Sequence, residues 1–164
     1  MTTTASTQRQ FDLRLPTGRP LVPVSACMVV LDRNEDDVLM LIDEGHLTVA
    51  FDIASRRAAR REIRVWRESI LLYAANDYAA MARATDALAA DLAPALDAIL
   101  APRAMEHIRA RELADRFTCS STHVLQLVEE GSITGPAPKG RGPNSSPRIV
   151  RNSVAAFLQS RRIT

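Results

Sequence analysis

The chain has 164 residues, of which 46% are hydrophobic and 24% charged, a composition typical of globular proteins and unlike that of disordered ones. No apolar run approaches the roughly 20 residues that a membrane-spanning helix needs, and no signal peptide opens the chain, so we expect a soluble protein of the reducing cytoplasm. The formal net charge is only +2, but every basic side chain except Lys139 is an arginine, a residue suited to bidentate contacts with phosphate and guanine.

The N-terminal part of the sequence predicts a polar tail followed by two short helices. Residues 1–19 open with a threonine-rich stretch that has nothing to bury, and we interpret them as a flexible tail. Ser25 is placed to cap a helix over residues 26–31, and Asn34 is placed to cap a second helix that Gly45 ends. The first turn of this second helix is acidic, with Glu35, Asp36 and Asp37.

After Gly45 the pattern changes to that of a β-hairpin followed by a helical connector. LTVAFDI, from Leu47, and REIRVW, from Arg61, predict two strands around the basic segment ASRRAARR. From Ser69 an alanine- and leucine-rich segment predicts a long helix with a break or kink at Pro94. One face of this connector carries a stripe that could pack inside the chain or pair with another copy or a protein partner: Leu88, Leu92, Leu96 and Ile99 or Leu100.

The C-terminal part repeats the order of elements. IRARELADRF predicts a short helix, Ser120 caps the next helix, and Gly131 ends it. Ile133 begins a strand, GPAPKGRGPNSSP predicts a turn-rich basic loop, RIV returns as a strand, and SVAAFLQSRRI closes the chain as a helix. Residues with the spacing to close a small core are Leu113, Ala114, Phe117, Val124, Leu127, Val128, Ile133, Ile149, Val154 and Phe157.

The repeated order indicates an internal duplication. A shift of 86 residues superposes Asn34 on Ser120 and Gly45 on Gly131, and beyond the loop a shift of 84 superposes RVWRESI on RIVRNSV. We therefore expect a mainly α fold with small β-hairpins. Residues 20–70 and 104–164 would form two equivalent units, and residues 71–103 would form a helical connector between them.

A short helix, a tight turn with a serine before the second helix, an EEG ending and a basic hairpin together make a helix-turn-helix with a wing. ELADRFTCSSTHVLQLVEEGSI followed by PRIVRNSVAAFL resembles the excisionase and MerR-type winged helix-turn-helix family, from about Ile108 to Leu158. VLMLIDEGHL and REIRVWRESI resemble the same family more faintly. The resemblance implies two tandem winged units, in which a capped recognition helix enters the major groove of DNA and the wing reaches a neighbouring groove or the backbone.

The second unit carries the expected side chains for such contacts. Opposite its apolar face, the second helix presents short hydroxyl and amide groups near a helix N-terminus, where phosphate is favoured. The wing and its returning strand are basic, and no acidic residue lies between Ile133 and Ile163. A merely solvated surface is the alternative for both groups. The predicted DNA-contacting residues of this unit are Ser120, Ser121, Thr122, His123, Gln126, Lys139, Arg141, Arg148 and Arg151.

The first unit differs from the second in charge. Its carboxylates Glu35, Asp36 and Asp37 take the places of Ser121, Thr122 and His123 and would repel phosphate. Two hypotheses remain: this unit contacts DNA through its wing, with a reduced helix contact, or its acidic surface holds a protein partner. The predicted DNA-contacting arginines of this wing are Arg56, Arg57, Arg60, Arg61, Arg64 and Arg67.

The sequence thus favours a sequence-specific protein that binds double-stranded DNA, either as a transcriptional regulator or as an excisionase-like architectural factor associated with the nucleoid. The alternative is a non-enzymatic adaptor that binds a protein through the acidic first unit. Because His46, His107 and His123 lie far apart in the pattern, and because no metal-ligand spacing is visible, we expect neither catalysis nor a cofactor.

Overall fold

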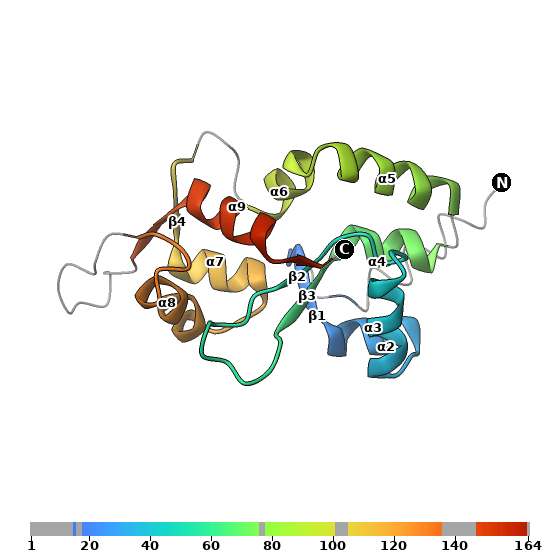
Figure 1. Cartoon of the computed structure of the whole chain (residues 1–164), viewed down its shortest axis with the longest axis horizontal. Helices are drawn as coiled ribbons and strands as arrows, with labels where there is room; N and C mark the ends of the chain where they lie inside the picture. The colour runs from blue at the N-terminus through green and yellow to red at the C-terminus, as the bar shows by residue number, and fades with distance from the viewer. Residues whose placement is uncertain (1–14, 16–17, 76–77, 101–104, 136–146, 164) are drawn as a thin grey trace.

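A computed structural model describes residues 15, 18–75, 78–100, 105–135 and 147–163. Within these ranges the chain has a mixed α/β fold in which helices predominate over two small antiparallel sheets (Figure 1). The helices are α2 (Val24–Leu31), α3 (Glu35–Asp43), α4 (Arg67–Ala74), α5 (Tyr78–Ala90), α6 (Ala93–Ile99), α7 (Ala110–Phe117), α8 (Ser121–Glu129) and α9 (Arg151–Ser160). The strands are β1 (Leu21–Pro23), β2 (Ala50–Asp52), β3 (Ile63–Trp66), β4 (His107–Arg109), β5 (Arg148–Val150) and β6 (Arg162–Ile163). None of the helices described is at once long and apolar enough for a bilayer crossing.

Four strands form the larger sheet in the order β1-β3-β2-β6, and β4 and β5 form the smaller one. The predicted hairpin of β2 and β3 is confirmed, with Phe51 opposite Arg64. The C-terminal helix was predicted to run to Ile163, but α9 ends at Ser160 and β6 pairs with β2, so that Ala50 lies opposite Ile163. The last residues of the second half therefore extend the sheet of the first half.

The predicted caps of the two central helices are confirmed. Asn34 Oδ1 accepts a hydrogen bond of 2.8 Å from the backbone N–H of Asp37, and Ser120 Oγ accepts one of 3.1 Å from that of His123. Gly45 and Gly131 follow these helices with φ angles of +76° and +70°, which favour glycine. The predicted cap at Ser25 is wrong, because α2 begins at Val24, two residues earlier than predicted, and follows Pro23 with no side-chain cap.

Further details of the backbone recur at the same two shifts of 86 and 84 residues. Strands β1 and β4, which the sequence did not indicate, precede α2 and α7 and pair with β3 and β5 in equivalent registers. The N–H of Arg67 donates to Pro20 O and that of Arg151 to Glu106 O, both at 2.9 Å. Asp32 and Thr118 end α2 and α7 in the left-handed conformation. The local geometry of the two halves is therefore repeated as well as their sequence pattern.

The predicted break at Pro94 is confirmed, because α5 ends at Ala90 and α6 begins at Ala93, but a further interruption between α4 and α5 was not predicted. Helices α4, α5 and α6 follow one another, and Pro94 lies in the first turn of α6, where its missing N–H needs no helical partner. In Figure 1 α5 and α6 cross one edge of the molecule above both halves. Leu88, Leu96 and Ile99 of the predicted stripe are buried inside the chain.

The larger hydrophobic core joins the two halves. Leu21, Phe51 and Ile53 from the first half belong to the same buried cluster as Leu113 and Phe117 from the second. A second cluster lies within the first half, under α2 and α3. The core predicted for the second half is confirmed, although Val128 is only half-buried. The halves are therefore packed together through apolar side chains and are not joined by the connector alone.

Candidate nucleic-acid interface

The basic segment of the first half lies against the predicted recognition helix of the second. We call residues 53–62, between β2 and β3, the basic loop; it extends from the sheet alongside α8 (Figure 1). Asp52 Oδ1 closes the base of this loop, because it accepts hydrogen bonds of 3.0 Å from the N–H groups of both Ala54 and Glu62. The geometry of the loop is therefore tied to the end of β2.

The polar face of α8 is partly covered by the basic loop. His123 Nε2 donates to Ile53 O over 2.8 Å, and His123 Nδ1 lies 3.4 Å from a carboxylate oxygen of Glu62. Gln126 Nε2 donates to Ser55 Oγ over 3.1 Å. His123 and Gln126 were predicted to face DNA, but they bind the first half of the chain instead.

The start of α8 remains open to solvent. Ser120, Ser121 and Thr122 are exposed, and in the contacts among the described residues only the Ser120 hydroxyl takes part, as the cap of the helix. The free N–H groups of the first turn and the two exposed hydroxyls are donors suited to phosphate oxygens. Of the side chains predicted on this helix, Ser120, Ser121 and Thr122 are exposed, whereas His123 and Gln126 are only partly exposed and are bonded to the basic loop.

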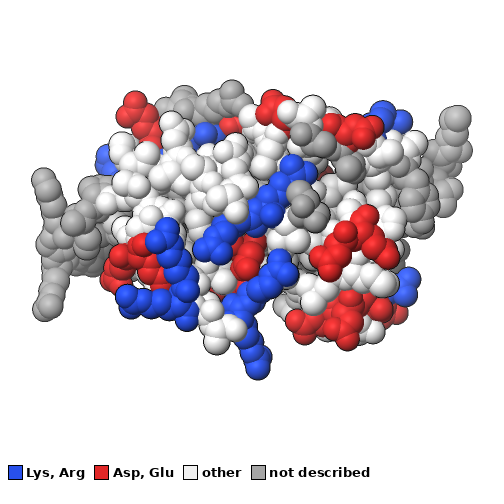
Figure 2. All heavy atoms as spheres, viewed as in Figure 1, with Lys and Arg blue, Asp and Glu red and all other residues white. Residues whose placement is uncertain are grey.

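Four arginines of the basic loop are exposed: Arg56, Arg57, Arg60 and Arg61. Figure 2 shows basic side chains gathered over this loop and over the C-terminal strand, while acidic side chains gather over α3 at the right of the view. Arg61 lies 3.4 Å from Asp52 and its side chain is still 60% exposed, so solvent weakens that ion pair. Arg161 and Arg162, which sequence analysis did not single out, flank the same sheet through β6.

Arg64 was predicted to contact DNA, but it is buried and has a structural role. Its Nε donates to Phe117 O over 2.8 Å, and its Nη2 donates to Thr118 O over 3.1 Å and to Glu62 over 2.7 Å. These carbonyls belong to the C-terminal end of α7, where a cation is favoured by the helix dipole. A guanidinium group held in this way cannot reach a duplex.

Arg151 is a second residue that was predicted to contact DNA but is buried in the structure. It is buried, and its Nη2 donates to Asp97 of α6 over 2.5 Å. Arg67 is half-buried, with its side chain 17% exposed and its Nη1 3.8 Å from Glu68. Both residues follow a strand and begin a helix, and Arg151 is turned toward the connector.

Arg148 is exposed on β5, at some distance along the chain from the basic loop. It lies opposite Arg109 of β4, which is also exposed and which sequence analysis did not single out. Like charges opposite each other on two strands repel, so an anion bound between them would be stabilising. The register that brings them together could not be read from the sequence. The predicted contacts Lys139 and Arg141 lie outside the described residues.

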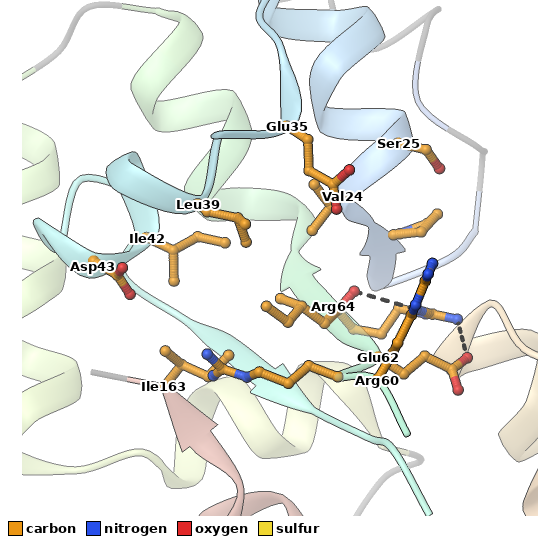
Figure 3. A pocket seen from close by; sticks show the side chains of 13 residues that line it. Val24, Ser25, Glu35, Leu39, Ile42, Asp43, Arg60, Glu62, Arg64 and Ile163 are labelled. Atoms are coloured by element: carbon orange, nitrogen blue, oxygen red, sulfur yellow. Dashed lines mark hydrogen bonds and ion pairs between the residues drawn. The ribbon is translucent and has the colours of Figure 1, made fainter. Parts of the chain in front are cut away.

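The acidic end of α3 borders a hollow between that helix and the hairpin. The hollow has a volume of about 520 Å³, with Leu39 and Ile42 of α3 on one side and Arg60 of the basic loop on the other (Figure 3). Glu35 lines its mouth, and Asp36 is exposed beside it. The carboxylates keep this end of the first half negative.

Within the described ranges, no three His, Cys, Asp or Glu side chains come together as a metal site. Burial raises the pKa of Cys27 to about 12, and burial is also the main reason why the pKa of Cys119 is raised to about 12. Both thiols are therefore protonated at neutral pH and are poor nucleophiles.

Comparison of the chain with protein-family models, with curated proteins and with solved structures finds no match of any of the three kinds.

Proposed function

We propose that the protein binds double-stranded DNA as a transcriptional regulator or an excisionase-like architectural factor, with each half acting as a winged helix-turn-helix unit. The observation that carries the proposal is the placement of the basic loop. This loop carries four exposed arginines and is bonded along α8, from His123 in the first turn to Glu130 at the helix end, so positive charge lies beside a helix whose start is open.

The proposed contacts with DNA are of two kinds, one to the phosphates and one to base edges or the nearby backbone. Arginines of the basic loop bind phosphates, which releases counterions and supplies most of the affinity. Ser121 and Thr122 at the start of α8 are the groups that approach base edges or the backbone nearby. Because His123 and Gln126 are bonded to the basic loop, fewer side chains of α8 can contact bases than the sequence alone predicts.

A fluorescence anisotropy titration of duplex DNA at several salt concentrations tests the proposal. Replacing Arg56, Arg57, Arg60 and Arg61 with glutamine should weaken binding, and the slope of log K against log salt should fall by about 0.9 for each lost phosphate contact. The control is Arg83→Gln, because Arg83 is an exposed residue of α5. This substitution should leave the slope unchanged. A flat salt dependence of the unaltered protein would exclude this function.

A non-enzymatic adaptor is the second candidate, and the hollow beside the exposed carboxylates of α3 is the observation that favours it. A basic protein segment would be attracted to this end of the molecule. Replacing Glu35, Asp36 and Asp37 with lysine would then abolish partner binding without changing the affinity for DNA. Tighter DNA binding by this variant would instead place α3 close to the duplex and remove support for the adaptor.

A further inference from the structure

Glu130, at the end of α8, has an unexpected place in a surface that is proposed to bind phosphate. One of its carboxylate oxygens accepts a hydrogen bond of 2.8 Å from the backbone N–H of Arg56, in the basic loop. The other accepts one of 3.3 Å from Gln126, which also donates to Ser55 of the loop. The carboxylate therefore lies within the most basic part of the chain and is bonded to it.

We propose that Glu130, together with Gln126, is a positioning residue for DNA binding, which holds the basic loop along α8 although its own charge repels phosphate. This inference rests on the proposed function. Glu130 acts through the loop backbone, and the arginine side chains beside it make the contacts with DNA. Its two effects on affinity are opposite in sign, so they can be separated.

The basic loop needs such an attachment because its own composition does not fold it. Its tip holds Ala58 and Ala59 between two pairs of arginines, all of them exposed, so no large apolar side chain anchors the tip. Asp52 fixes the base of the loop, and the bonds to Gln126 and Glu130 fix the arm that leads to the tip. Ordering a free segment on binding costs roughly 1–2 kcal/mol per residue in backbone entropy, so a loop that is already ordered binds more tightly.

The ionisation of Glu130 agrees with this role. The hydrogen bond from the N–H of Arg56 is the main reason why the pKa of the Glu130 carboxyl lies below its ordinary value. The equivalent residue of the first half, Glu44, instead lies 3.5 Å from His46, two residues along its own chain. The attachment of a distant loop is therefore a property of the second helix end and not of the repeated EG sequence.

Glu129 is a matched control for Glu130. It is the last residue of α8, it carries the same charge and it is exposed, and its carboxylate makes no hydrogen bond or ion pair with the described residues. Glu129→Ala and Glu130→Ala remove one negative charge each from the same part of the surface. If charge alone matters, both substitutions tighten DNA binding. If Glu130 positions the loop, only Glu129→Ala does so.

The experiment measures DNA affinity at one low salt concentration for the full chain and three variants. We expect Glu129→Ala to bind about twofold more tightly, because an exposed charge interacts weakly through water. Glu130→Ala should bind roughly fivefold more weakly, the change that loss of one net hydrogen bond produces. Gln126→Ala changes no charge and should also weaken binding. Tighter binding by Glu130→Ala, equal to that of Glu129→Ala, would overturn the inference and leave the proposed function intact.

A second readout needs no DNA. Trypsin cleaves after arginine, and its rate of cleavage in the basic loop reports how often the loop leaves α8. Glu130→Ala and Gln126→Ala should be cleaved faster in the loop than the unaltered protein, and Glu129→Ala should not. Equal rates of loop cleavage for all four proteins would be enough to exclude the positioning role of Glu130 and Gln126. A folded protein with a protected loop that fails to bind DNA would end the proposed function instead.

Discussion

Arg64 illustrates how burial changes the role of a basic side chain. It lies two residues after the basic loop, but its guanidinium group satisfies two carbonyls at the end of α7 and pairs with Glu62. Its residue is only 7% exposed, whereas Arg60 in the loop is exposed. Of these two arginines, which are four positions apart, Arg64 therefore holds the fold together and Arg60 stays exposed for the proposed contact with DNA.

Substitution of these two arginines should separate the two effects. Arg64→Ala should lower the free energy of unfolding by about 3 kcal/mol, because it leaves the carbonyls of Phe117 and Thr118 without their donor and removes the ion pair with Glu62. Arg60→Ala should change the unfolding free energy by less than about 0.5 kcal/mol and weaken DNA binding. Urea denaturation followed by circular dichroism measures the first effect. Similar stability of the two variants would show that the buried contacts of Arg64 contribute little.

At the scale of elements, the equivalent C-terminal ends of α2 and α7 make different contacts. Asp32 and Thr118 both end a helix with positive φ angles, 53° and 49°. Asp32 is exposed, and its backbone N–H bonds to Met28 O. Thr118 additionally donates its hydroxyl to Leu21 O over 2.6 Å and so links α7 to β1 of the other half.

Glycine at each of these positions should therefore have different consequences. Asp32→Gly should raise the free energy of unfolding by about 0.5–1 kcal/mol, because glycine adopts the left-handed conformation without strain. Thr118→Gly should give no gain or a loss, since removal of the hydroxyl costs the bond to Leu21. Thermal unfolding of the two variants measures the difference. An equal gain at both sites would mean that the Thr118 hydroxyl adds nothing to the contact between the halves.

For the whole molecule, the shared core predicts that the two halves unfold together. Phe51 and Ile53 of the first half are buried with Leu113 and Phe117 of the second, and β6 completes the sheet of the first half. Trp66, in β3, is the only tryptophan of the chain and packs against this core. Its fluorescence reports on the first half, while circular dichroism at the helix band reports on both.

Chemical unfolding should show one transition that is the same for both signals. Leu113→Ala, at a fully buried position of the second half, should lower the unfolding free energy by roughly 2–5 kcal/mol and shift the Trp66 transition equally. An early transition by circular dichroism, with the fluorescence transition unmoved, would indicate halves that unfold independently. The exposed substitution Arg83→Ala should move neither signal.

The features that the sequence predicted correctly are those with local causes. Asn34 and Ser120 are caps because their side chains reach an N–H three residues ahead, and Gly45 and Gly131 end helices because their own φ angles are positive. The β2–β3 hairpin and the core of the second half follow from alternation and helical spacing within short segments. None of these depends on which distant segment lies opposite.

The tertiary structure alone decided which polar side chains stay exposed. Strands β1, β4 and β6 are only two or three residues long and are defined by pairing with distant strands, so no local sequence pattern predicts them. His123 and Gln126 have the composition of a DNA-reading face, and Arg64 and Arg151 the composition of a basic patch, until the other half or the connector packs on them. Local chemistry determines what a side chain can bind. Whether that side chain is accessible depends on contacts between residues far apart in the chain, and burial of apolar surface over the whole molecule determines which of these contacts form.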